Sequence, residues 1–202
     1  MNKKVPRRQL ILESLATELE KSPGSRITTA ALARANGVSE AALYRHFASK
    51  ARMFEGLIEF AEESVFARIN QIMESEKSTR QRCAKVLYLL LAFADRNPGI
   101  TRVLLGDALV GEHERLHARV EQFFARVETQ FRQILREARM REEAQLDVVD
   151  AEQGASLMLA LVEGRMQRYL RTRFRASPLA DWERQWQLVE PSLFALPDSV
   201  PA

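Results

Sequence analysis

The sequence predicts an all-α protein on three observations. Glycine and proline are few, eight and seven in 202 residues, and most of them stand between long segments rather than inside them. Within these segments apolar residues recur every three to four positions, which is the period of an amphipathic helix. No segment alternates apolar and polar residues as a half-buried strand does. Helices are therefore expected to pack on helices around a common core.

Composition limits the class of protein further. The chain is 46% hydrophobic, which excludes an intrinsically disordered chain, and its length allows one or two domains of about 150 residues. The single cysteine, Cys83, excludes a disulfide scaffold. No apolar run reaches the roughly 18 residues of a membrane span. We expect a cytoplasmic protein without a membrane segment.

Three short helices are expected at the N-terminus. The first, 8–21, has an apolar face and stops at a Ser-Pro-Gly-Ser sequence. The second, 30–35, follows two threonines and ends at Asn-Gly, where glycine supplies the left-handed backbone of a tight turn. The third, 40–47, follows Ser39, whose hydroxyl can accept a hydrogen bond from a free N–H group of the first turn. A small core between the second and third helices is expected from Leu32, Val38, Leu43 and Phe47.

Longer helices fill the rest of the chain. Ser49 begins a helix that continues to about residue 75, and the next, 80–96, ends at an Asn-Pro-Gly break before a short helix at 100–105. Two long helices with apolar stripes follow, separated by a linker at 144–149. A last helix contains two tryptophans that are expected to dock it on the body. These three helices are expected at 109–142, 150–174 and 181–194.

Helices 30–35 and 40–47 have the arrangement of a helix-turn-helix, in which the second helix enters the major groove of DNA. Residues 1–52 hold ten basic and four acidic residues, a net charge of +6, whereas the rest of the chain has a net charge of −3. A basic segment on a slightly acidic body favours an anionic partner for that segment only. We predict a DNA-binding domain at 1–52 and a helical dimerisation and partner-binding domain at 53–202.

The expected recognition helix has an inner and an outer face. Leu43 and Phe47 face inward, which leaves small side chains on the outer face to approach base edges closely. Arg45 has two roles open to it, to read guanine or to bind a phosphate. Hydroxyl, imidazole and ammonium groups nearby suit phosphate contacts. The residues predicted to form the DNA interface are Thr28, Thr29, Ser39, Ala41, Ala42, Tyr44, Arg45, His46 and Lys50.

The sequence from Val38 to Phe47, preceded by Thr28 and Thr29, resembles the DNA-binding signature of TetR-type regulators. That resemblance implies a repressor that leaves its operator when a small ligand fills the C-terminal domain. A narrower resemblance, to the SlmA family of nucleoid occlusion factors within the TetR class, covers nearly the whole chain. It is found in the segments 49–54, 57–60, 68–70, 95–99, 135–137 and 140–142.

The narrower resemblance implies a homodimer that binds palindromic DNA, assembles with further dimers there, and is associated with the nucleoid. It also implies that the DNA-bound protein binds the C-terminal tail of FtsZ and antagonises the division ring over the chromosome. The family's tail groove lies between the fourth and fifth helices. Its apolar positions would contact the peptide and its arginines would pair with carboxylates. The matching residues are Phe60, Arg68, Leu89, Ala92, Arg96 and Asn97.

Two features of the sequence bear on the expected groove and the expected dimer. The family often has Gly-Phe-Gly where this chain has Ala92-Phe93-Ala94, and the two added methyl groups are expected to narrow the groove. The two long helices have stripes suited to a dimer bundle, with small residues at Gly154, Ala155 and Gly164 to permit close approach.

One motif points to an enzyme instead. His113-Glu114-Arg115-Leu116-His117 matches H-E-x-x-H, which on a helix places two zinc-binding histidines on one face beside a general base. A zinc hydrolase is therefore a remote alternative. The surrounding residues are those of a charged, solvated helix, and no phosphate-binding loop or catalytic triad spacing is evident. We expect no enzyme and no cofactor.

Overall fold

The computed structural model describes residues 6–141 and 150–194, and within these ranges it is helical without a β-strand. The all-α prediction is confirmed. The helices of the described residues are α1 (Arg7–Lys21), α2 (Thr29–Ala35), α3 (Glu40–Tyr44), α4 (Lys50–Ser75), α5 (Thr79–Arg96), α6 (Pro98–Leu104), the 3-10 turn η1 (Asp107–Leu109), α7 (Glu114–Met140), α8 (Ala151–Arg171) and α9 (Trp182–Leu193).

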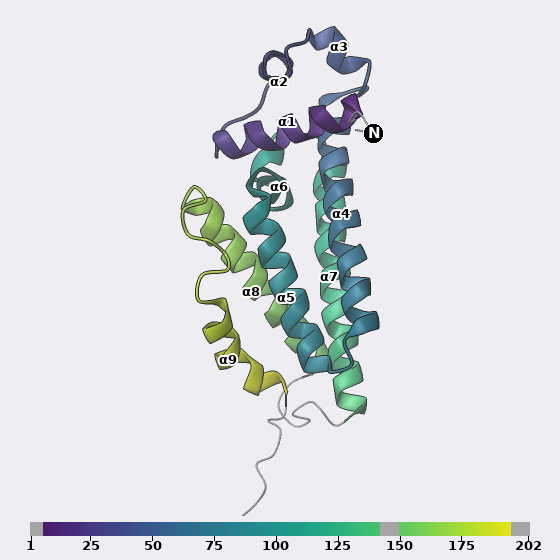
Figure 1. Cartoon of the computed structure of the whole chain (residues 1–202), viewed down its shortest axis with the longest axis vertical. Helices are drawn as coiled ribbons and strands as arrows, with labels where there is room; N and C mark the ends of the chain where they lie inside the picture. The colour runs from purple at the N-terminus through teal and green to yellow at the C-terminus, as the bar shows by residue number, and fades with distance from the viewer. Residues whose placement is uncertain (1–5, 142–149, 195–202) are drawn as a thin grey trace, which may run out of the picture.

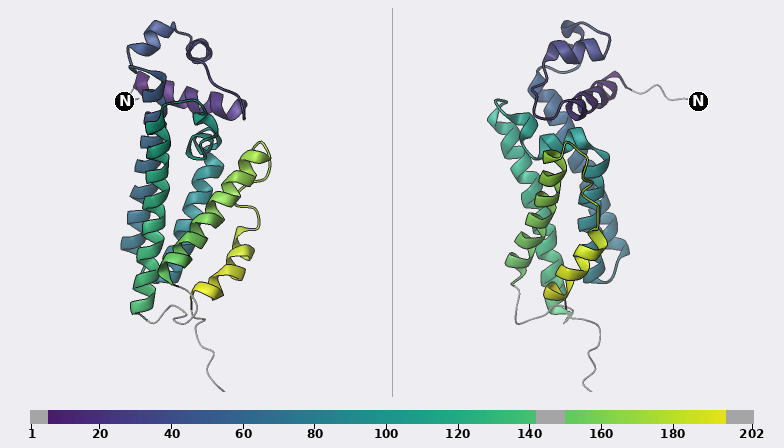
Figure 2. Two further views of the ribbon diagram at one scale, coloured as in Figure 1. Left: turned by 180° about the vertical axis from the view of Figure 1, so that it is seen from behind. Right: turned by 90° about the vertical axis from the view of Figure 1, so that its left-hand side faces the viewer.

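The molecule is elongated, with α1, α2 and α3 at one end of its long axis (Figure 1). Helices α4, α5, α7 and α8 run along the body, and α7 packs against α8 as an antiparallel pair (Figure 2). Helix α6 lies under α1, and α9 packs on α5. One apolar core continues from Leu15 of α1 to Phe131 of α7 and Met158 of α8. Cys83 is fully buried in this core, and burial raises the pKa of its thiol.

Three helix ends differ from the sequence-based expectations. Helix α3 stops at Tyr44, although Phe47 still reaches the core. Helix α7 begins at Glu114 rather than at 109, because left-handed glycines at 106 and 111 break the backbone before it. Helix α8 ends at Arg171, and Arg173 and Phe174 both have positive φ angles. Non-glycine residues seldom adopt that conformation, so the sequence does not signal this end.

A buried arginine joins the N-terminal helices to the body. The Arg102 side chain on α6 is fully buried, and its Nη1 donates to the carbonyls of Leu19 and Ser22, both at 2.7 Å. Its Nη2 donates to the Ser25 carbonyl at 3.0 Å, and its Nε pairs with Asp107 at 2.5 Å. The last carbonyls of a helix have no partner within the helix. Arg102 therefore satisfies backbone groups at and beyond the end of α1.

Close backbone contact reinforces the same junction. A Cβ atom at Gly99 would lie 1.9 Å from the Ala16 carbonyl oxygen of α1. Real Cβ atoms do not approach backbone oxygen so closely, so any side chain at position 99 would push α6 away from α1. The absence of a side chain at Gly99 is what lets the two helices touch.

Helix α9 is fixed by its two tryptophans, as the sequence predicts. Trp182 and Trp186 are buried in the core cluster and stack with ring centroids 6.0 Å apart. The Trp186 indole N–H donates to Glu190, and Glu190 also forms a two-point ion pair with Arg80 of α5, both contacts at 2.6 Å. The hydrogen bonds from Arg80 hold the pKa of the Glu190 carboxyl below its usual value.

Candidate nucleic-acid interface and peptide groove

Helices α2 and α3 form the predicted helix-turn-helix, joined by a turn in which Gly37 has a φ of +62°. Thr28 Oγ1 accepts a hydrogen bond from the Ala31 N–H at 3.1 Å, and Ser39 Oγ accepts one from the Ala42 N–H at 3.2 Å. These are N-caps. Because each hydroxyl oxygen acts as the acceptor, its proton remains available for donation to a phosphate oxygen.

The outer face of α3 is open. Tyr44 is 45% exposed, and Ala41, Arg45 and His46 are exposed too, while Ala42 is half-buried. The side chains of Tyr44, Arg45 and His46 have no hydrogen bond or ion pair within the described ranges. Leu43 is completely buried beneath them. Five predicted interface residues therefore lie on α3 or directly after it, and α3 stands at the tip of the molecule (Figure 1).

Two residues predicted to contact DNA are bonded to other side chains of the protein. Lys50 turns toward the body, where its Nζ pairs with Glu112 at 2.6 Å and lies 5.5 Å from the centre of the Phe54 ring. The Thr29 hydroxyl donates to Glu40 at 2.5 Å, which links the starts of α2 and α3. Thr29 therefore supports the helix-turn-helix and Lys50 links the start of α4 to the body, so neither presents a free donor.

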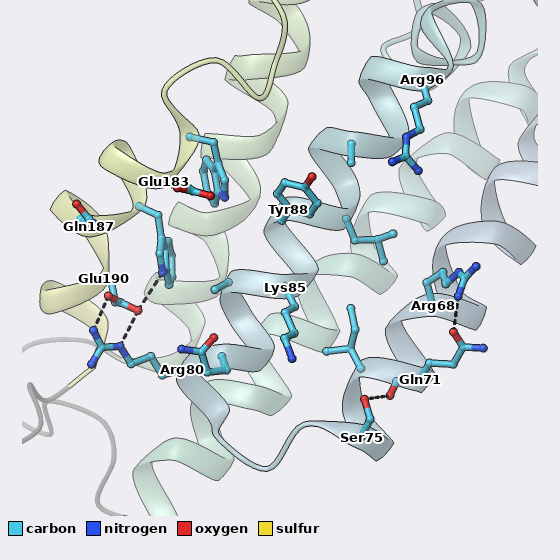
Figure 3. Close-up of a pocket in the computed structure, with 17 residues that line it drawn as sticks. Arg68, Gln71, Ser75, Arg80, Lys85, Tyr88, Arg96, Glu183, Gln187 and Glu190 are labelled. Carbon is cyan, nitrogen blue, oxygen red and sulfur yellow. Dashed lines mark hydrogen bonds and ion pairs between the residues drawn. The ribbon is translucent and has the colours of Figure 1, made fainter.

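A groove of about 780 Å³ runs over the outer surface of α5, between α4 on one side and α9 on the other (Figure 3). Four of the six residues predicted for a peptide groove line it: Arg68, Leu89, Ala92 and Arg96. Tyr88, which is 49% exposed, stands on the α5 surface between the two walls. We call the part between α4 and α5 the α4–α5 groove.

The two walls differ in charge. On the α4 side Arg68 donates to Gln71 at 2.9 Å, and Arg96 is exposed without a hydrogen bond or ion pair to any described residue. On the α9 side Glu183 adds a carboxylate, and the charges of Arg80 and Glu190 neutralise each other. An acidic peptide is therefore favoured on the α4 side. The α9 wall was not anticipated, because its two tryptophans read only as core residues in the sequence.

Phe60 and Asn97 lie beyond this groove, in an adjoining hollow of about 340 Å³ between α1, α4 and the start of α6. Phe60 is 48% exposed, and its ring centroid is 6.4 Å from that of Phe93. Arg96 lines both the groove and the hollow. All six predicted residues thus lie along one continuous surface.

The two alanines in Ala92-Phe93-Ala94 have different surroundings. Ala92 lines the groove, so its methyl group occupies groove space as expected. Ala94 is completely buried, and its carbonyl accepts the Thr101 hydroxyl. The expectation that both methyl groups narrow the groove is therefore wrong for Ala94, which faces the core.

The residues predicted to permit close helix approach in a dimer also differ in their exposure. Gly154 and Ala155 are buried within the subunit, so they permit packing inside the chain. Gly164 is exposed, with nothing within 4 Å of a Cβ built on it, and Leu157 on α8 is 51% exposed. The open small-residue and apolar surface of α8 is therefore at 157–164 rather than at 154–155.

The H-E-x-x-H motif does not form the predicted one-face pair. His113 lies before α7 as its N-cap, and its Nδ1 accepts the Arg115 N–H at 3.2 Å. His117 Nε2 lies 3.1 Å from the Leu109 carbonyl, which engages that nitrogen. Among the described residues no group of three His, Cys, Asp or Glu side chains is placed to hold a metal ion. In the same ranges no helix is long and apolar enough to cross a membrane.

Comparison with known proteins identifies relatives of this fold. Residues 11–57 match the family model of bacterial regulatory proteins, tetR family, and residues 77–193 match a model described as a tetracyclin repressor-like, C-terminal domain. Two solved structures share the fold. Ketosteroid transcriptional regulator KstR2 of Mycobacterium tuberculosis has a TM-score of 0.77 at 17% identity, over 96% of this chain and 98% of that one. MbdR of Azoarcus sp. CIB has a TM-score of 0.78 at 16% identity, over 93% and 98%.

Relatives of much higher identity narrow the family. Nucleoid occlusion factor SlmA of Shewanella halifaxensis is 56% identical over 190 residues, which cover 94% of this chain and 96% of the relative. The protein of the same name from Idiomarina loihiensis is 54% identical over 189 residues, with the same coverage of both chains. This chain belongs to the SlmA family of nucleoid occlusion factors, within the TetR family of bacterial regulatory proteins.

Proposed function

We propose that this protein binds a palindromic DNA site as a homodimer and that the DNA-bound form binds the C-terminal tail of FtsZ. Ring assembly would then be antagonised where the protein sits on the nucleoid. The observation that carries this proposal is the α4–α5 groove, which brings Arg68, Leu89, Ala92 and Arg96 to one surface in a chain 56% identical to SlmA.

The DNA half of the proposal rests on the tip of the molecule. Ala41, Tyr44 and Arg45 are exposed on the outer face of α3, and the first 52 residues have a net charge of +6. Phosphate contacts position such a helix, and base-edge contacts in the major groove specify the sequence. Two copies are needed because half-sites of a palindrome recur about 34–36 Å apart along the duplex.

The FtsZ half rests on the chemistry of the groove. Arginine pairs with carboxylates through two parallel hydrogen bonds, which suits an acidic tail. Among the described residues the Arg96 side chain has no competing partner, and the Arg68 guanidinium donates only to the neutral Gln71. Leu89 adds apolar contact area to the same groove. The protein's body has a net charge of −3, so an acidic peptide requires this local basic site.

A pair of variants tests whether DNA and FtsZ bind to separate surfaces of the protein. We expect Tyr44→Ala to weaken operator binding about tenfold, because a contact of about 1–3 kcal/mol is lost at the DNA interface. We expect Arg68→Asp to leave operator binding unchanged and to abolish the effect of the DNA-bound protein on FtsZ polymers. Fluorescence anisotropy measures the first effect, and pelleting of FtsZ polymers with operator present measures the second.

Arg184→Asp is the matched control, because Arg184 is an exposed arginine on α9 that does not line the groove. It should behave as the parent in both assays. If Arg68→Asp antagonised FtsZ as well as the parent did, the groove assignment would be refuted. If the parent bound operator but did not affect FtsZ at all, the protein would be better described as a TetR-type repressor.

A further inference from the structure

We propose that Glu112 holds Lys50 against the body in the free protein and that a DNA phosphate takes its place when the protein binds an operator. The inference rests on the DNA-binding half of the proposed function and adds a residue of the body to it. Glu112 acts on DNA only through Lys50, so it is a positioning residue. The contact restrains DNA binding, because every operator bound must break it.

Glu112 lies in the segment 106–113 between α6 and α7, which we call the strap. The N-terminal domain is bonded to the strap at two points. Arg26 Nη2 donates to the Val110 carbonyl at 2.9 Å, and Lys50 Nζ pairs with Glu112 Oε1 at 2.6 Å. Two of the ten basic residues in 1–52 are therefore engaged by the strap. Only the contact with Glu112 sets a full negative charge against one of them.

The ion pair between Lys50 and Glu112 can be broken by a competing anion. Their side chains are 23% and 16% exposed, so the pair is reached from solvent. An ion pair near the surface contributes little to stability. The lysine ammonium has three donors on a flexible four-carbon stem, so it can change its partner while α4 stays in place. Lys50 is therefore restrained in the free protein but not locked.

Lys50 stands where a phosphate can compete for it. It is the first residue of α4, which begins at the end of the molecule that carries α3 (Figure 1). The exposed side chains of Tyr44, Arg45 and His46 precede it directly in the chain. The DNA backbone that borders the recognition helix therefore passes the side of the molecule on which α4 begins. A lysine that meets a phosphate also releases counterions, which a pair with Glu112 does not.

The exchange makes a prediction that a merely structural ion pair does not. If Lys50 contacts a phosphate in the complex, its removal lowers the slope of log K against log salt by about 0.9. If Glu112 only competes for Lys50, its removal tightens binding and leaves that slope unchanged. The effect of Glu112 must also vanish when Lys50 is absent, because Glu112 has no other route to the DNA.

A double-mutant cycle on Lys50 and Glu112 tests the exchange. The probe is a fluorescently labelled duplex that carries the palindromic site the parent selects from a random pool, titrated by anisotropy against the full-length protein at several salt concentrations. We expect Glu112→Gln to bind about threefold more tightly, the size of a surface ion pair. We expect Lys50→Gln to bind about threefold more weakly, with the smaller slope, and the double variant to match Lys50→Gln.

Glu114→Gln is the matched control, since it removes the same charge from an exposed position two residues away. Its affinity should stay close to that of the parent. Circular dichroism confirms that each variant is folded. If Glu112→Gln bound no more tightly than Glu114→Gln, or tightened binding equally when Lys50 was absent, the exchange would be overturned.

Two further outcomes separate the exchange from DNA binding itself. If Lys50→Gln kept the affinity and the salt slope of the parent, Lys50 would stay on Glu112 in the complex. The exchange would then be wrong while the DNA-binding function stood. If the parent selected and bound no duplex, the DNA-binding half of the proposed function would fail and the exchange with it.

Discussion

Arg102 shows how one residue couples the two parts of the chain. Its guanidinium is fully buried and bonds to three backbone carbonyls between Leu19 and Ser25, and to Asp107. An arginine in a short helix is ordinarily expected to be solvated, and the three carbonyl partners of Arg102 lie some 80 positions earlier in the chain. Sequence patterns report local spacing, so this contact could not have been predicted from them.

We expect Arg102→Met to lower the free energy of unfolding by about 3 kcal/mol, because it leaves buried carbonyls without donors and Asp107 without its cation. Urea denaturation followed by circular dichroism measures this loss. Arg184→Met, at an exposed site, is the control and should change stability by less than about 0.5 kcal/mol. Equal stability of the two variants would show that Arg102 does not hold the junction.

The DNA-interface residues show what local spacing does predict. Tyr44, Arg45 and His46 are exposed as expected, because the buried Leu43 sets which way the short helix faces. Lys50 and Thr29 are exceptions, since Lys50 pairs with Glu112, 62 positions away and across the fold, and Thr29 donates to Glu40 of the next helix. Residues whose orientation depends on their own helix are predictable, and residues whose partners come from a distant element are not.

Among the helices, starts with a hydroxyl cap were predictable, whereas the start of α7 at Glu114 was not. The sequence places Thr28, Ser39 and Ser49 before helices, and each hydroxyl accepts a hydrogen bond at the start of the helix that follows. The end of α8 lies where Arg173 and Phe174 adopt left-handed conformations, which tertiary packing imposes and sequence does not announce. The linker expected at 144–149 lies outside the described residues.

Docking of α9 depends on pH through Glu190. Because Arg80 lowers the pKa of this carboxyl in the folded protein, the pair contributes stability above about pH 4.5, the ordinary value for glutamate. That contribution is lost as the pH falls through the lowered folded pKa. Both tryptophans of the chain lie on α9, so tryptophan fluorescence reports on this helix alone.

We expect acidification below about pH 4.5 to shift the tryptophan emission to the red as α9 leaves α5. Glu190→Gln removes the titrating group, and it should show a weakened α9 at neutral pH, by about 1–2 kcal/mol, with no further change around pH 4. The same acid-induced shift in parent and variant would mean that other carboxylates control α9.

For the whole molecule, the separation of charge makes DNA binding sensitive to salt. Residues 1–52 have a net charge of +6 and include the tip helices α1, α2 and α3, whereas the remainder of the chain has a net charge of −3. Each phosphate neutralised by the protein releases counterions, and the slope of log K against log salt is about −0.9 per contact. We expect a steep slope for the parent, and for Arg45→Ala a slope smaller by about one if Arg45 binds a phosphate.

Operator anisotropy at several salt concentrations measures both slopes. Arg184→Ala is the control and should keep the parent slope, because this residue is remote from the tip. A flat response of the parent would show that its operator affinity does not come from phosphate contacts. An unchanged slope for Arg45→Ala, with weaker binding at every salt concentration, would assign Arg45 to base reading instead.

The candidate groove was predictable only in part. Family resemblance selected six residues, and the fold aligns them along one surface from Arg68 to Phe60. The α9 wall and the hollow beside α1 were not foreseen, because each is formed by a helix distant in sequence from α4 and α5. Surfaces shared by three helices depend on how the whole chain packs. Periodicity within one helix does not predict the packing of distant helices against each other.

The most direct test of the central claim is the affinity of a labelled FtsZ C-terminal peptide for the parent protein, measured by anisotropy with and without a palindromic operator. We predict saturable binding that tightens when operator is present, and loss of that binding in Arg96→Asp. No binding under either condition would contradict the account.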